Sequence, residues 1–133
     1  MKSVVVDTHA VYWYLKDIRQ LSAPALQALQ EATRAGDPIY VASITLVELI
    51  YLVEKSKVAQ EGLDLLYDAL AKLQASLVLM PLELSVVQAL AGIPRSIVPD
   101  MPDRIIAATA LALNVPLVSR DRQIQASSIH TIW

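Results

Sequence analysis

Four acidic residues stand where their carboxylates can meet in one site. They are Asp7, Glu48, Asp103 and Asp121. Carboxylates that converge without as many bases repel one another, by about 4 kcal/mol for a pair at about 4 Å in an effective dielectric near 20. Such a cluster is stable if it protonates, spreads apart or binds a hard cation. The chain has no cysteine and only two histidines, so its oxygen donors favour Mg²⁺ or Mn²⁺ over zinc.

A divalent ion on these acids indicates phosphate chemistry. The ion neutralises a phosphodiester and lowers the pKa of a bound water, and a second ion stabilises both the attacking and the leaving oxygen. The sequence therefore predicts hydrolytic cleavage of a phosphodiester bond.

Each acid also has a purely structural interpretation. An aspartate between a strand and a helix is often only an N-cap, which for Asp7 or Asp100 taken singly is the preferred explanation. Asp121 lies between two arginines and Asp103 beside one, so both can form local ion pairs. Glu48 lies in an apolar segment, where an unpaired acid is costly, so a functional role is at least as plausible as a salt bridge. Only the convergence of the set points to a site.

The histidines and aromatic residues carry less weight. His9 could orient a ligand or touch RNA, but a lone histidine near a helix start more often caps or packs, and His130 receives no role. Trp13, Tyr12 and Tyr14 could stack a base. Core packing or a dimer contact is the preferred role for this aromatic group.

Short apolar runs alternate with helical patterns along the chain and must position these residues. Predicted strands span residues 4–6, 39–42, 77–80, 117–119 and 129–133. Predicted helices span residues 8–15, 23–34, 46–55, 63–73, 83–91 and 101–113, with a short one before the last strand. This alternation predicts a parallel sheet covered by helices on both faces. Ligands bind beyond the carboxyl ends of such strands, so the acids should share one rim.

The composition predicts one domain over residues 1–133, without repeat or linker. Hydrophobic residues make up 55% of the chain, and the mean hydropathy is +0.45. This is more apolar surface than one small core readily hides, which indicates a partner or self-association surface. The helix over 46–55 is apolar on nearly every face and should be buried on both sides.

The net charge of −2 gives no global attraction for a polyanion. Nucleic acid must therefore be held locally, by metal on the carboxylates or by arginines close to the cleft. The longest weakly charged stretch, 105–119, is shorter than the about 18 apolar residues of a membrane span. With no signal-peptide pattern at the N-terminus, we expect no transmembrane segment and a cytoplasmic location.

Four ordered segments extend a family resemblance over essentially the whole chain. They are VDTHAVYW at 6–13, SITLVEL at 43–49, DMPDRIIAATA at 100–110 and LVSRDRQI at 117–124. Together they resemble the PIN-domain family, in particular the VapC-like toxin ribonucleases of toxin–antitoxin pairs. Met101 departs from the pattern, because similar sequences often carry an aromatic residue there.

The resemblance implies an α/β/α sandwich with a mainly parallel central sheet and a Mg²⁺- or Mn²⁺-dependent endoribonuclease. It assigns Asp7, Glu48, Asp103 and Asp121 as the acidic quartet, with Asp7 and Asp103 as principal ligands. It makes Thr8, Ser43, Asp100 and Ser119 supporting or phosphate-contacting groups, and Arg104 an RNA-binding or acid-pairing residue. It also implies an RNA substrate, a homodimer and a VapB-like antitoxin that covers the cleft.

Two other function classes are alternatives to the nuclease. A haloacid-dehalogenase-type phosphatase needs a second aspartate two residues after the first, where this chain has His9, and a receiver domain needs its strand-end aspartate later. A PIN-like fold kept only as a binding module is the other alternative, which the intact quartet disfavours.

Overall fold

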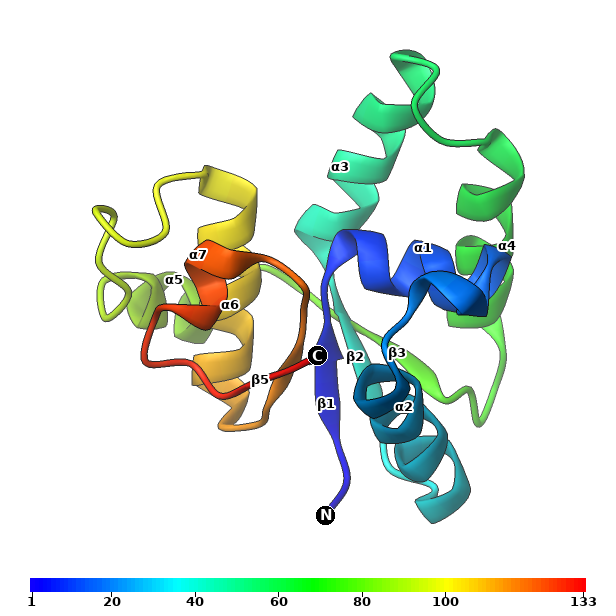
Figure 1. The fold of residues 1–133 in the computed structure, drawn as a ribbon, viewed down its shortest axis with the longest axis horizontal. Coiled ribbons are helices and arrows are strands. Elements are labelled where there is room, and N and C mark those ends of the chain that lie inside the picture. Colours follow the sequence, from blue (N-terminus) through cyan, green and yellow to red (C-terminus); the bar gives the residue numbers. More distant parts are fainter.

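Five strands form one all-parallel sheet in the computed structural model, which describes all 133 residues (Figure 1). The strands are β1 (Val4–Val6), β2 (Ile39–Ala42), β3 (Leu77–Met80), β4 (Leu117–Val118) and β5 (Thr131–Ile132). Their spatial order is β3-β2-β1-β4-β5. The central strand consists of buried valines, as expected for a strand covered on both faces.

Seven α-helices and one 3₁₀ turn connect the strands. They are α1 (Thr8–Lys16), the turn η1 (Ile18–Gln20), α2 (Ala23–Ala35), α3 (Ser43–Glu54), α4 (Gln60–Ala71), α5 (Leu84–Leu90), α6 (Met101–Leu113) and α7 (Arg122–Gln125). Ser22 caps the start of α2, and Gly36 ends it with a left-handed φ of 71°. No helix combines the length and the apolar character needed to cross a membrane.

The two faces of the sheet pack into separate cores. Val4 and Val6 join the core formed with α1, α2 and α4, whereas Val5 joins the core formed with α5, α6 and α7. Alternate side chains of one strand point to opposite faces, which explains this division. Figure 1 shows the two helical layers with the sheet between them. The predicted three-layer α/β/α sandwich is confirmed.

The strand order reverses between β1 and β4. From β1 the chain moves to β2 and β3 on one side, then returns through α5 and α6 to β4 on the other. The connections after β1 and β4 therefore lead away from each other and leave a crevice at their carboxyl ends. Asp7 directly follows β1 and Ser119 directly follows β4.

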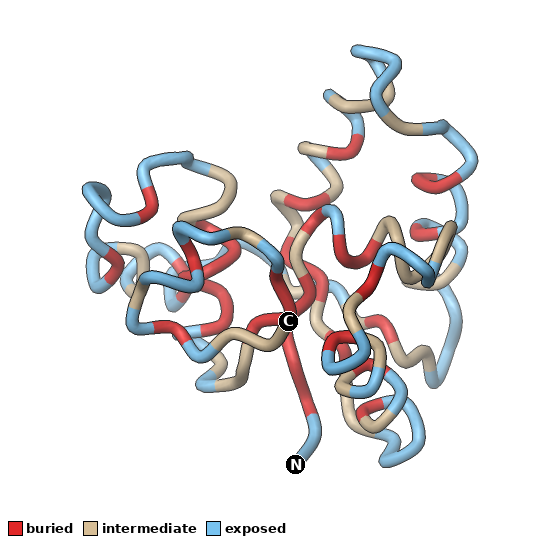
Figure 2. Tube along the Cα trace, in the orientation of Figure 1, coloured by how far each residue is buried: buried red, intermediate tan, exposed pale blue.

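Helix α3 differs from its prediction. It begins at Ser43, directly after β2, instead of at residue 46. The prediction that it is buried on both sides is wrong, because only Thr45 and Leu49 are buried while Val47 and Tyr51 are 45% and 59% exposed. Figures 1 and 2 give the reason: α3 and α4 extend past the carboxyl ends of the strands, where no second layer covers them.

Smaller differences lie at the ends of elements. Leu73, predicted as part of an amphipathic helix, lies beyond the end of α4 and is 96% exposed. The last two strands are shorter than predicted, each with only two residues paired. A periodic pattern of hydrophobic residues indicates that a helix or strand is present, but it does not give the residue at which the backbone hydrogen bonds end.

Candidate functional site

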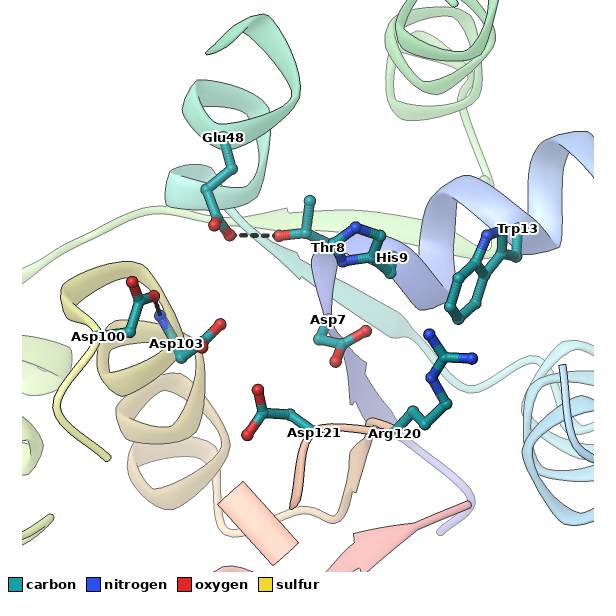
Figure 3. Close-up of a pocket in the computed structure, with 9 residues that line it drawn as sticks. All are labelled: Asp7, Thr8, His9, Trp13, Glu48, Asp100, Asp103, Arg120 and Asp121. Carbon is teal, nitrogen blue, oxygen red and sulfur yellow. Dashed lines mark hydrogen bonds between the residues drawn. The ribbon is translucent and has the colours of Figure 1, made fainter. Parts of the chain in front are cut away.

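The largest concentration of acids lines a cavity of about 340 Å³ at the crevice (Figure 3). Its lining consists of Asp7, Thr8, His9, Trp13, Glu48, Asp100, Asp103, Arg120 and Asp121. All four acids of the predicted quartet are among them, together with two of the predicted supporting residues, Thr8 and Asp100. The predicted convergence on one rim is therefore present.

Asp7 is fixed between the two central strands. Its N–H donates to the carbonyl of Val118 at 3.1 Å, and its Oδ1 accepts from the N–H of Ala10 at 2.9 Å, which caps α1. Burial raises the pKa of Asp7, and a hydrogen bond from the Ser119 hydroxyl opposes that rise. The Asp7 side chain lines the cavity, near the centre of Figure 3.

The tightest acidic group lies where α3 meets the start of α6. Carboxylate oxygens of Glu48, Asp100 and Asp103 all lie within 4.8 Å of one another. Asp100 is the N-cap of α6 and accepts from the N–H of Asp103 at 3.1 Å. Asp100, expected only as a supporting residue, is therefore as well placed as Asp103 to bind a cation.

The close spacing and burial of these carboxyl groups raise the pKa values of Asp103 and Glu48. Burial raises the pKa of Asp103 to about 8, with further contributions from the charges of Asp100, Asp121 and Glu48. Burial also raises the pKa of Glu48. Asp103 therefore keeps a proton near neutral pH unless a cation takes its place.

Glu48 is held by one hydroxyl group instead of a base. The Thr8 hydroxyl donates to Oε1 of Glu48 at 2.5 Å and also lies 3.3 Å from the Thr45 hydroxyl. Both threonines are buried. No lysine or arginine neutralises Glu48, so the salt-bridge interpretation of this residue does not hold.

Asp121 caps the short helix α7. Its Oδ1 accepts from the N–H groups of Gln123 at 2.9 Å and Ile124 at 3.0 Å, while its own N–H donates to Oγ of Ser119 at 3.0 Å. Neither flanking arginine forms an ion pair with it, since the ion pairs of the structure are Lys2–Glu31, Lys16–Glu61 and Arg19–Asp17. Ser119 thus links the connections after β1 and β4.

Two predicted site residues lie elsewhere. Oγ of Ser43 accepts from the N–H of Leu82 at 3.0 Å, and the Arg104 guanidinium donates to the carbonyls of Ile93 at 2.9 Å and Leu90 at 3.2 Å. Arg104 follows Asp103 by one residue, which turns its side chain by about 100° around the helix and toward α5. It neither lines the cavity nor pairs with an acid.

Three cavity residues were not among the predicted site residues. Trp13, assigned to packing or a dimer contact, lines the cavity with His9, and Arg120 lies over the Trp13 ring with 4.7 Å between the guanidinium carbon and the ring centroid. His9 and Trp13 are four residues apart on α1, a spacing that places them on one face of the helix. Arg120 comes two residues after β4. The spacing of His9 and Trp13 and the position of Arg120 just after a strand could both have been read from the sequence.

The donor set fits a hard divalent cation. Five carboxylates, from Asp7, Glu48, Asp100, Asp103 and Asp121, face one cavity whose lining has one arginine and no lysine. The three most closely spaced acids can each supply an oxygen to one ion. The raised pKa values of Asp7, Glu48 and Asp103 mean that ionising these carboxyl groups in the folded chain has a cost, which a bound cation would offset.

The chain matches known proteins over nearly its whole length. The family model described as PIN domain matches residues 4–128. Ribonuclease VapC22 of Mycobacterium tuberculosis is 31% identical over 126 residues, which cover 95% of this chain and 92% of that protein.

Solved structures share the fold at low sequence identity. VapBC2 from Rickettsia felis, bound to a DNA fragment from its promoter, superposes with a TM-score of 0.71 at 18% identity, over 97% of this chain and 96% of that one. A toxin–antitoxin complex from Klebsiella pneumoniae gives a TM-score of 0.61 at 16% identity, over 98% and 96% of the two chains.

Proposed function

The chain belongs to the PIN domain family, and from this premise we propose that it is a Mg²⁺- or Mn²⁺-dependent endoribonuclease, the toxin of a VapBC-type toxin–antitoxin pair. The observation that carries the proposal is the meeting of five carboxylates from four separate segments in one cavity with a single arginine. The ribonuclease name of the Mycobacterium tuberculosis relative, 31% identical, supports RNA as the substrate.

The acids would perform two tasks, and Asp7 would take part in both. Glu48, Asp100 and Asp103 would hold the cation, with Asp7 completing the set across the cavity. A bound ion would neutralise the phosphate and lower the pKa of water near it. Asp7 and Asp121 line the same cavity and would orient the attacking water and accept its proton. In-line attack with the 3′ oxygen leaving gives 5′-phosphate and 3′-hydroxyl ends.

The neighbouring hydroxyl groups would keep these carboxylates in place. Thr8 orients Glu48 through its hydrogen bond, and Ser119 contacts both Asp7 and Asp121. Such supporting contacts commonly contribute a factor of about 10–100 to metal affinity.

The exposed apolar surface fits an antitoxin partner. A groove of about 370 Å³ between α3 and the start of α6 is lined by Val47, Tyr51 and Met101 among others, and it shares Glu48 with the acidic cavity. A segment of antitoxin seated here would extend over the site and block it. The similar folds of the Rickettsia felis and Klebsiella pneumoniae complexes support such a partner. We also propose a cytoplasmic homodimer, for which exposed Leu84 and Val87 on α5 offer apolar contact.

The test combines metal binding with RNA cleavage. Purified protein is melted with Mn²⁺ and with EDTA, and the same samples are incubated with RNA whose product ends are then mapped. We expect stabilisation by Mn²⁺, of about 2.7 kcal/mol at 100 times the dissociation constant, and metal-dependent cleavage leaving 5′-phosphates.

The rival functions give different results in the same assay. A PIN-like binding module binds Mn²⁺ and RNA without cutting it. A phosphatase releases inorganic phosphate from a phosphomonoester and leaves internal RNA bonds intact. Either outcome rejects the ribonuclease.

A further inference from the structure

Arg120 is a cation without an anionic partner in a cavity full of acids. Asp7 and Asp121 line the same cavity, yet none of the three ion pairs of the structure includes Arg120. The side chains of Arg19 and Arg104 donate hydrogen bonds, whereas the side chain of Arg120 donates none. The N–H donors of the guanidinium, which match phosphate oxygens in pairs, are therefore all free.

An aromatic cluster holds this arginine in place. The guanidinium carbon lies 4.7 Å from the Trp13 ring centroid, and Trp13 in turn packs at 6.0 Å against Trp133 and at 5.5 Å against His9. A cation on an aromatic face is oriented without using its N–H donors. In Figure 3 the guanidinium points toward Trp13 and away from Asp121.

The fold explains why these residues meet. Trp13 lies on the helix that follows β1, Arg120 lies just after β4, and Trp133 directly follows β5. These three strands are neighbours in the parallel sheet, so their carboxyl ends share one edge. Trp13 and Arg120 thus form one wall of the acidic cavity, and Trp133 packs against Trp13 from outside the lining.

We propose that Arg120, held on Trp13, binds a backbone phosphate of single-stranded RNA beside the phosphate that is cut, and so positions the strand. This inference rests on the proposed ribonuclease function. The chain has a net charge of −2, and Arg120 is the one arginine or lysine among the nine cavity residues. A polyanion entering this cavity meets no other lysine or arginine in its lining.

The surroundings of Arg120 favour an unpaired strand. The rings of Trp13 and the exposed His9 lie beside Arg120 and give unpaired bases surfaces on which to stack, whereas the bases of a duplex are already stacked on one another. The proposed substrate is therefore RNA with an unpaired nucleotide next to the cut.

Binding to RNA tests the proposal directly. Every variant is made in the Asp7→Asn background so that the RNA stays intact, and the anisotropy of a labelled single-stranded RNA is measured in Mg²⁺. We expect Arg120→Gln to weaken binding about tenfold and to reduce the slope of log affinity against log salt by about 0.7, the value for one lost contact to a single strand. Arg120→Lys should keep the salt slope and lose part of the affinity.

Arg122→Gln is the matched control. Arg122 belongs to the same connection, is exposed, and lies outside the cavity lining, so its removal changes the net charge equally. We expect this variant to bind RNA like its parent. Equal effects of Arg120→Gln and Arg122→Gln would overturn the proposal, as would equal affinity for the duplex of the same sequence.

Tryptophan fluorescence locates the bound strand. The chain has two tryptophans, and both belong to this cluster. Single-stranded RNA should quench their emission with the same dissociation constant that anisotropy gives. Binding that leaves the emission unchanged would place the RNA elsewhere and reject the inference.

Cleavage kinetics separate this inference from the proposed function. With Asp7 intact, Arg120→Gln should raise KM about tenfold and change kcat far less, as expected for a positioning residue. Cleavage with wild-type KM in that variant rejects the role of Arg120 and leaves the ribonuclease standing. Absence of cleavage by the wild-type chain rejects the ribonuclease, whereas the binding experiment still decides whether Arg120 holds RNA.

Discussion

The acidic residues of the cavity both cap helices and build the site. Asp7, Asp100 and Asp121 are the N-caps of α1, α6 and α7. Sequence patterns present the cap and the site as alternatives, but a carboxylate has two oxygens and can serve both. The positive ends of the two longer helices, α1 and α6, also offset part of the repulsion among the acids. Capping thus fixes the direction of the remaining oxygens.

Asp7→Asn separates these two roles. Asparagine caps helices about as well as aspartate, so the melting temperature should stay within a few degrees of wild type. Its amide cannot replace the negative charge, and we expect cleavage to fall at least about 100-fold. Melting curves and RNA cleavage rates measure the two effects. Unchanged cleavage would remove Asp7 from the chemistry.

Thr8 offers a test of how Glu48 is held. Thr8→Val removes the hydroxyl that donates to Glu48 while keeping the shape of the side chain. We expect Mn²⁺ affinity to fall about tenfold, measured by calorimetry, because Glu48 loses both its orientation and a contact that lowers its pKa. Thr8→Ser keeps the hydroxyl and should bind Mn²⁺ nearly as the wild type does. Equal affinities in all three proteins would contradict this role.

The raised pKa of Asp103 makes the metal-free protein sensitive to pH. Its pKa is about 8 in the folded chain and near the ordinary value of 3.8 in the unfolded chain, so between these pH values the folded state binds the extra proton. The resulting stability is complete below the unfolded pKa and is lost as the pH rises through about 8. In EDTA, the melting temperature should therefore fall from about pH 5 to about pH 9.

Two comparisons test this assignment. Asp103→Asn should flatten the decline, and Mn²⁺ should reverse it because the ion replaces the proton. The raised pKa of Glu48 acts in the same direction, so part of the slope should remain in the variant. A decline equally steep in wild type and variant would reject Asp103 as its source.

At the level of elements, the sequence predicts the sheet well because its strands are short apolar runs between helix signals. Gly36 and Pro81 end elements where predicted. The burial of α3 could not be predicted, because hydrophobicity does not say how far a helix extends past the sheet. Arg104 and Arg120 show the same limit for the site, since one step along a helix turned Arg104 away while the strand order brought Arg120 in.

Gly62 controls the packing of α4 against α1. A Cβ at this position would lie 2.2 Å from Cε2 of Tyr12, whose hydroxyl is fixed by the N–H of Ala59 at 3.1 Å. Gly62→Ala should therefore destabilise the fold by about 1–3 kcal/mol, measured by urea unfolding. In a Tyr12→Ala background the ring is absent, and the same substitution should cost much less. Equal costs in both backgrounds would show that the ring is not the obstacle.

At the level of the whole molecule, the apolar composition appears as uncovered surface at the projecting helices (Figure 2). Tyr51→Glu places a charge in the groove between α3 and α6. We expect it to weaken binding of the proposed antitoxin by at least about tenfold, measured by calorimetry. Gln88→Glu, an exposed position on α5, is the control with the same charge change. Unchanged affinity in Tyr51→Glu would exclude this groove as the antitoxin site.

The reversal of strand order has a mechanical consequence. Asp7 and Trp13 belong to one helical layer, whereas Asp100 and Asp103 belong to the other, and the sheet is their main connection. A ligand bound by residues of both layers would join the two layers directly. Loading the cavity should therefore slow amide hydrogen exchange in both layers at once, far from any atom that the ligand touches.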